Sequence, residues 1–237
     1  MKRRDLKNQA KAALKDNFGS KMLLFIIPII LGIFSRGNQV HTVLTDNNIN
    51  FSADAGGASV SHLALLIAGP IIAVTVLITI AISLFIIVIT TGAIFNYIKI
   101  FRGERSNPQF KNIFAPFSDG SLWKIVLLNV VIGLVMIVLI LIPIIGWAFA
   151  VYLGLGWSQS TYVLFDQLEE GRYAGVKQVL RESSAKMKGL RGNYFIYKLS
   201  FFWWYILNGI SGGLAGFWTM PYFNMADIAY YENIENL

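Results

Sequence analysis

Lys198 and Asp227 are the two charged residues of the predicted spans 193–208 and 213–231, and they are the first candidates for chemistry. Charged groups in apolar surroundings are costly unless they are paired, so they often mark functional sites. If the glycine-rich stretch around Ser211 is a turn, the two side chains lie at similar depth on adjacent helices. We expect them to pair directly or through water, with Asn224 or Tyr222 nearby. The alternative is structural: the lysine snorkels to the interface and Asp227 is an ordinary carboxylate at a helix end.

Asn129 and Gln159 are polar residues within other apolar segments, and each is a candidate for lining a binding cavity. More often such groups make hydrogen bonds between helices, each worth about 0.6 kcal/mol. Trp203, Trp204 and Trp218 are typical of interface anchors or of packing within a hairpin, and an aromatic ligand box is the less favoured interpretation.

Sequence motifs for catalysis are missing. The chain has no cysteine and two histidines, His41 and His62, without an HExxH pattern, so a zinc site is not expected. Residues 156–160 begin like a nucleophile elbow but lack its final glycine. No phosphate-binding loop or dinucleotide fingerprint occurs. We therefore predict a protein that is not an enzyme and has no metal and no cofactor.

The composition indicates a membrane protein. Of 237 residues, 55% are hydrophobic and 14% are charged, whereas a soluble domain has roughly a quarter charged residues. The net charge of +7 is compatible with a nucleic-acid binder, but its distribution along the chain favours a membrane surface.

The predicted fold is all-α: a polytopic membrane helix bundle in a single domain, with about six transmembrane helices. Residues 62–98 are free of Asp, Glu, Lys and Arg and are long enough for one tilted span or barely for two. One span is favoured, with an extension that bends along the interface. For the last region, the rival to a hairpin is one long tilted helix. The predicted spans are 22–36, 64–92, 125–142, 147–165, 193–208 and 213–231.

Three other segments are amphipathic. Residues 1–21 are predicted to form a basic helix on the membrane surface, with a solvated tail as the alternative. Residues 101–122 carry an aromatic face, and 166–191 are expected to pack one apolar face on the membrane or the bundle. Residues 37–61 read as a polar outer loop. The face of 166–191 consists of Val176, Val179, Leu180, Ser183 and Met187.

The distribution of basic residues predicts the topology. With both termini inside, 19 of the 20 Lys and Arg residues lie on the inner side, and Arg36 alone lies outside. The positive-inside rule therefore predicts a multi-pass protein of the cell membrane with cytoplasmic termini. The basic loops then face anionic inner-leaflet lipid, at about 1 kcal/mol per residue near the surface, and no nucleic acid is needed as a partner.

Several short motifs along the chain carry a family resemblance. They are Leu6-Lys7-x-x-Ala10-Lys11-x-Ala13-Leu14-x-x-Asn17, Arg102-Gly103-Glu104, Ile113-Phe114-x-x-Phe117, Ser183-Ser184-x-x-Met187-Lys188-Gly189, Leu199-Ser200-Phe201-x-x-Trp204, Gly216-Phe217-Trp218-x-x-Pro221-Tyr222 and Ala229-Tyr230-Tyr231. In these motifs the chain resembles the domain of unknown function 975 family, a family of bacterial membrane proteins. The resemblance implies a helical membrane bundle with cytoplasmic termini and implies no activity. A further likeness is to the membrane part of some glycerophosphodiester phosphodiesterases, without their hydrolase domain.

Three functions compete. The first is a non-enzymatic membrane protein that binds or supports a membrane partner, either lipid, another membrane protein or a second copy of the chain. The second is a transporter or channel for a small solute, favoured by prolines and polar groups at depth. The third, a lipid-modifying enzyme, needs a nucleophile or an acid–base pair that the sequence does not offer.

Overall fold

The computed structural model describes residues 3–33, 62–106 and 108–234, and every regular element in these ranges is a helix. The all-α prediction is confirmed for them. The predicted outer loop 37–61, with His41, lies outside the described residues. Two of the helices are long and apolar enough to cross a membrane.

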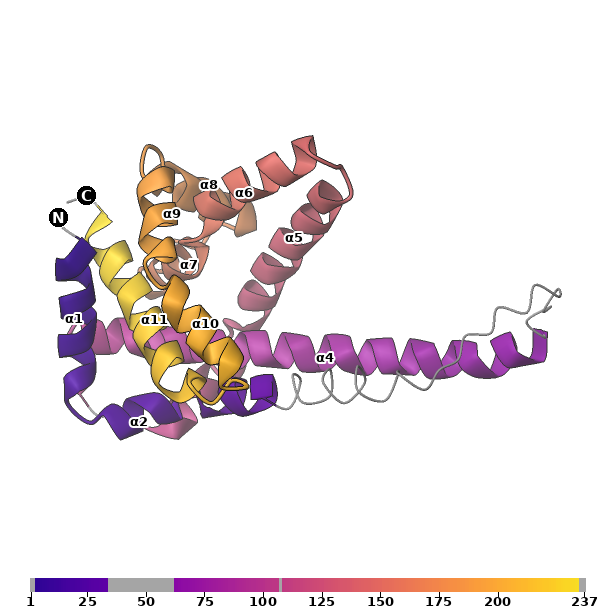
Figure 1. Ribbon diagram of the computed structural model, residues 1–237, viewed down its shortest axis with the longest axis horizontal. Helices are drawn as coiled ribbons and strands as arrows, with labels where there is room; N and C mark the ends of the chain where they lie inside the picture. The colour runs from indigo at the N-terminus through magenta and orange to yellow at the C-terminus, as the bar shows by residue number, and fades with distance from the viewer. Residues whose placement is uncertain (1–2, 34–61, 107, 235–237) are drawn as a thin grey trace.

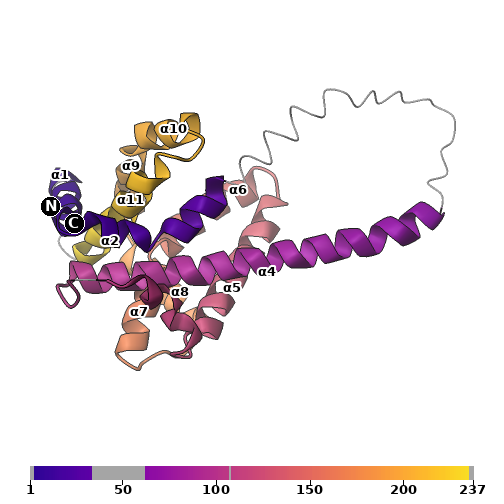
Figure 2. The same cartoon turned by 90° about the horizontal axis from the view of Figure 1, so that it is seen from below.

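The longest element is α4 (His62–Phe101), which is one unbroken helix of 40 residues. This agrees with one span rather than two. The predicted bend along the interface is absent, because α4 continues as a single rod that projects beyond the other helices (Figures 1 and 2). Only 6% of its most apolar 18-residue window is buried. A helix that is apolar on all sides and also exposed is suited to lipid rather than to a protein core.

Polar groups on the exposed part of α4 are satisfied within the helix itself. The hydroxyls of Thr75, Thr79 and Ser83 each donate to the backbone carbonyl four residues earlier, at 2.8 Å. Such bonds remove the need for water around these side chains.

The core gathers around the second half of α4, from Val88 to Ile100. There α4 contacts η2 (Phe110–Phe117), α5 (Leu122–Ile140), α7 (Ser160–Glu169) and α11 (Gly216–Glu232). Arg102, just beyond α4, joins two of these helices, because its guanidinium lies 2.7 Å from Asp166 Oδ1 on α7 and 2.8 Å from Glu232 Oε1 on α11.

Both predicted hairpins are present. α5 turns at residues 141–144 into α6 (Ile145–Trp157), where a Cβ atom on Gly146 would overlap the carbonyl oxygen of Leu139. α10 (Phe202–Ile210) turns into α11 through Gly212 and Gly213, both with positive φ. Glycine adopts this conformation without steric cost, so the last apolar region is a hairpin rather than one long helix.

Three of the predicted spans are interrupted and do not form single continuous helices. Segment 22–36 begins with the end of α2 (Phe18–Leu23) and resumes at residues 26–33. Pro28 explains this break, because it has no N–H for the carbonyl of Leu24 and its ring would clash with that group. Residues 34–36 lie outside the described residues.

Segments 147–165 and 193–208 are also interrupted. The first consists of α6 and α7, separated at Ser158 and Gln159, and the second of α9 (Arg191–Leu199) and α10. At each break a serine hydroxyl donates to the carbonyl three residues earlier, Ser158 to Leu155 at 2.8 Å and Ser200 to Tyr197 at 2.5 Å. Such side-chain bonds compete with the helical ladder.

The amphipathic segments fold largely as predicted. α1 (Arg3–Lys15) buries Leu6, Ala10 and Leu14, and it packs on α11. The entire predicted face of 166–191 is buried, where α8 (Val176–Lys186) packs on α6 and α7. The aromatic segment is the 3-10 helix η2, which buries Ile113 and leaves its three phenylalanines exposed.

Candidate functional site

The predicted pairing of Lys198 and Asp227 is confirmed. The ammonium of Lys198 on α9 lies 2.5 Å from Oδ2 of Asp227 on α11. The lysine side chain is 32% exposed and the aspartate side chain 13%. Tyr194, one turn before Lys198, donates a long 3.5 Å hydrogen bond to Oδ1 of the same carboxylate. Sequence reasoning missed Tyr194, although its spacing of four residues from Lys198 places both on one face of a helix.

Aromatic packing holds α9 against α11 around this pair. The hydroxyl of Tyr197 donates to the carbonyl of Ala226 at 2.8 Å. The rings of Tyr194 and Tyr197 lie 4.9 and 5.1 Å from the ring of Tyr230. The ion pair is therefore fixed in a packed interface, where its evident role is to neutralise two partly buried charges.

The other predicted site residues do not join this pair. Asn224 donates to the carbonyl of Met220 in its own helix at 2.8 Å, and Asn129 likewise to Ile125 at 2.9 Å. Gln159 is buried at the break between α6 and α7, where its amide nitrogen donates to the Ser158 hydroxyl and its amide oxygen has no hydrogen-bond partner. The proposed binding residues are thus spread over the fold.

Tyr222 belongs to a different feature, an apolar groove of about 640 Å³ between α1 and the α10–α11 hairpin. Its ring lies 6.3 Å from that of Trp204 and 5.7 Å from that of Phe201. Thr219 is buried, whereas Trp204 and Trp218 are 44% and 63% exposed. The residues lining the groove are Lys11, Ala12, Leu14, Lys15, Phe18, Trp204, Trp218, Thr219 and Tyr222.

Two contacts of lysine side chains fix α1 as one wall of the groove. Lys7 donates to the carbonyl of Ser200 at 3.3 Å, and its ammonium lies 4.3 Å from the centre of the Phe201 ring. Lys21 donates to the carbonyl of Ala13 at 2.7 Å, near the end of α1 where free carbonyls favour a cation. These contacts tie α1 to the α9–α10 connection at Ser200 and to α2 at Lys21.

The rim of the groove is basic. Lys11 and Lys15 are exposed, and neither makes an ion pair within the residues that the structure describes. The pKa of Lys7 is lowered by its partial burial and then by the positive charges of Lys11 and Arg3. Positive charge at Lys11 and Lys15 thus lies beside an apolar and aromatic surface.

No group of three or more potential metal ligands among His, Cys, Asp and Glu occurs in residues 3–33, 62–106 and 108–234. The groove itself offers cations and aromatic rings rather than a nucleophile beside a base. The arrangement is suited to binding an anionic amphiphile.

Comparison with protein families gives a match over the carboxy-terminal part of the chain. The model for "Protein of unknown function (DUF975)" matches residues 129–237. This confirms the resemblance for the carboxy-terminal part of the chain. The DUF975 match includes the α10–α11 wall of the groove and the Lys198–Asp227 pair, whereas α1 lies outside it. No curated protein and no solved structure matches the chain.

Proposed function

We propose that this protein is a non-enzymatic, multi-pass protein of the cell membrane that binds an anionic phospholipid in the groove between α1 and the α10–α11 hairpin. The observation that carries the proposal is the pairing of a basic rim, Lys11 and Lys15, with an aromatic floor formed by Trp204, Trp218 and Tyr222. The phosphate of the lipid contacts the lysines, and an acyl chain lies along the aromatic rings.

Exposed apolar side chains support the membrane location. Ile71, Leu77, Leu134, Ile145 and Phe149 are each more than half exposed, and they come from α4, α5 and α6. A soluble monomer rarely exposes so large an apolar surface, whereas hydrocarbon chains would cover it. About six spans with cytoplasmic termini remain part of this proposal, with the short helices α6–α7 and α9–α10 as broken spans.

The topology prediction has a direct test, because the chain has no native cysteine. In intact cells, a membrane-impermeant maleimide is expected to label Ser52→Cys and not Ser106→Cys. Ser106 follows α4, on the side where Arg102 meets Glu232 near the end of the chain. Permeabilised cells, in which both variants should react, provide the control, and equal labelling of both in intact cells would contradict cytoplasmic termini.

The groove is tested by quenching of tryptophan fluorescence with brominated lipids. In vesicles of matched total composition, brominated phosphatidylglycerol is expected to quench more strongly than brominated phosphatidylcholine, because Trp204 and Trp218 line the groove. Replacing both Lys11 and Lys15 with glutamine should lower the apparent affinity for the anionic lipid about thirtyfold, at about 1 kcal/mol per basic residue.

Two exposed lysines away from the groove, Lys111 and Lys188, provide the matched control. The Lys111→Gln/Lys188→Gln variant removes the same charge and should keep the preference for phosphatidylglycerol. The Trp204→Phe/Trp218→Phe variant should lose the lipid-selective part of the quenching. Equal quenching by both lipids, or an equal loss in the control, would argue against a lipid site in this groove.

A small-solute transporter is the second candidate. The breaks at Ser158–Gln159 and at Ser200–Phe201 favour it, since interrupted helices form substrate sites in many carriers. The buried amide oxygen of Gln159 without a partner is the position to test, and uptake in proteoliposomes that is abolished by Gln159→Leu would favour transport.

A further inference from the structure

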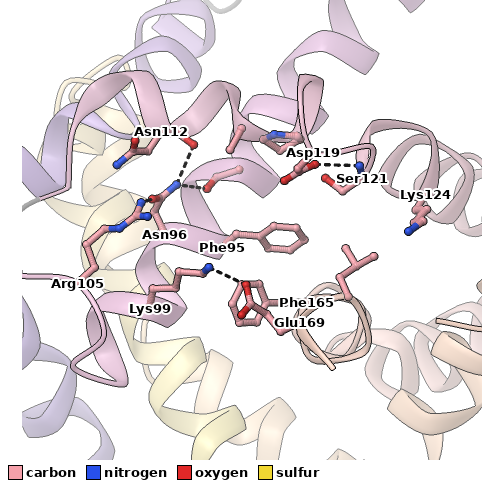
Figure 3. Close-up of a pocket in the computed structure, with 14 residues that line it drawn as sticks. Phe95, Asn96, Lys99, Arg105, Asn112, Asp119, Ser121, Lys124, Phe165 and Glu169 are labelled. Carbon is pink, nitrogen blue, oxygen red and sulfur yellow. Dashed lines mark hydrogen bonds and ion pairs between the residues drawn. The ribbon is translucent and has the colours of Figure 1, made fainter. Parts of the chain in front are cut away.

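A second cavity, of about 280 Å³, lies among α4, η2, the start of α5 and α7 (Figure 3). Its volume is near the lower end of about 300–1,000 Å³ that is typical of small-molecule sites. Unlike the groove, it is lined largely by polar and charged side chains. They are Asn96, Lys99, Arg105, Asn112, Asp119, Ser121, Lys124 and Glu169, with Phe95 and Phe165 among the apolar residues.

Two of its three cations have no carboxylate partner among the described residues. Arg105 donates to the side-chain oxygen of Asn96. The ammonium of Lys124 lies 5.1 Å from the centre of the Tyr173 ring and makes no ion pair. Lys99, by contrast, is paired with Glu169 at 2.6 Å. Positive charge is therefore in excess around the cavity.

One buried hydroxyl group at the cavity is free to make a hydrogen bond. Ser121 is 4% exposed, and its Oγ has no hydrogen-bond partner among the residues that the structure describes. Its backbone N–H donates to Asp119 Oδ1 at 2.9 Å, which occupies that carboxylate oxygen. Figure 3 shows Ser121 and Lys124 on one side of the cavity and Asn96, Lys99 and Arg105 on the other. A buried polar group without a partner is costly, and a bound acceptor relieves that cost.

The fold fixes this site before any ligand enters. Asn96 donates to the carbonyls of Gly92, at 2.7 Å, and Asn112, at 3.1 Å, and so joins α4 to η2. At Gly92 the two elements are so close that a Cβ atom would overlap the carbonyl oxygen of Ile113. Preorganised donors of this kind bind an anion at a lower entropic cost.

We infer that this cavity binds a phosphate group, with Arg105 and Lys124 as its charged donors and Ser121 as a hydroxyl donor. Phosphate presents acceptor oxygens on several sides, which suits donors from opposite walls of a small cavity. The phosphate group belongs either to a soluble phosphomonoester or to the headgroup of a lipid. In both cases the same donors of the cavity contact the phosphate oxygens. The site is separate from the groove and does not depend on it.

The test uses the full chain purified in detergent, with two probes. Glycerol 3-phosphate is titrated by calorimetry, and phosphatidic acid is titrated in mixed micelles with phosphatidylcholine. Lys124→Met should lower the affinity about tenfold or more, since a charge-assisted contact to phosphate is lost. Ser121→Ala should lower it about fivefold without loss of thermal stability, because its hydroxyl has no partner within the protein.

Lys111→Met on η2 removes a nearby exposed charge that does not line the cavity, and its affinity should stay within about twofold of the wild type. The Lys11→Gln/Lys15→Gln variant should bind glycerol 3-phosphate as the wild type does, because neither lysine lines this cavity, and this separates the site from the groove. Binding of both probes, each weakened by Lys124→Met, would show that the phosphate group is sufficient for recognition. Binding of phosphatidic acid but not of glycerol 3-phosphate, again weakened by Lys124→Met, would assign the site to a lipid headgroup. Binding of neither probe, or equal binding by all four variants, would overturn the inference.

Discussion

Replacing Asp227 with asparagine is expected to lower the thermal unfolding midpoint of the detergent-purified protein by about 4–8 °C. The substitution leaves the ammonium of Lys198 beside a neutral amide at a site where its partner carboxylate is mostly buried. Breaking a buried ion pair costs about 3–5 kcal/mol, and the one-third exposure of Lys198 reduces this to about 2 kcal/mol. For a chain of this size each kcal/mol corresponds to about 2–4 °C.

A second substitution, at Lys198, tests whether the lost stability comes from the unpaired lysine charge. Lys198→Met in the Asp227→Asn background removes the unpaired charge, and it should restore at least half of the lost thermal stability. Glu104→Gln, at an exposed position without an ion pair among the described residues, should leave the midpoint unchanged. An unchanged midpoint in Asp227→Asn would mean that the pair contributes nothing measurable to stability.

Gly92→Ala should also destabilise the protein, by about 1–3 kcal/mol or more. The added methyl group would overlap the carbonyl oxygen of Ile113 and lie 3.2 Å from Cδ of Pro116, so η2 must move away from α4. That movement also opens the cavity lined by Asn96, and it should increase proteolysis of the 101–122 segment.

Gly133→Ala is the matched control, because Gly133 also lies within a helix and a Cβ atom there has nothing within 4 Å. Alanine has the higher helix propensity, by about 0.8–1 kcal/mol, so this variant should be as stable as the wild type or more stable. The difference in thermal unfolding midpoint between the two variants measures how much stability depends on the close approach of η2 to α4 at Gly92. Equal midpoints would show that η2 adjusts without cost.

The local pattern of charged, apolar and glycine residues in the sequence predicted much of the fold. The charge-free run 62–98 indicated one long helix, and glycines near residue 212 indicated a hairpin. That turn predicted a similar depth for Lys198 and Asp227, and their pairing followed from elementary electrostatics. The amphipathic face of α8 was also predicted correctly, because helical periodicity depends on local sequence alone.

Other features depend on tertiary contacts and could not be predicted in this way. Serine residues occur within many intact helices, so Ser158 and Ser200 gave no sign that their hydroxyls would end α6 and α9. The groove combines α1 with a hairpin about 190 residues later in the chain, and this requires the packing of Leu6 and Leu14 on α11. The polar cavity beside Asn96 likewise combines side chains from α4, η2, α5, α7 and their connections, and none of these segments carries a recognisable motif.

The central claim is that an anionic phospholipid occupies the groove beside Lys11 and Lys15. The most direct measurement is mass spectrometry of the lipids that remain with the protein after mild detergent purification from its native membrane. We expect anionic phospholipid to be enriched severalfold over its share of that membrane, and Lys11→Gln/Lys15→Gln to lose most of the enrichment while Lys111→Gln/Lys188→Gln keeps it. Co-purified lipid with the composition of the bulk membrane, or the same enrichment in all three proteins, would contradict the claim.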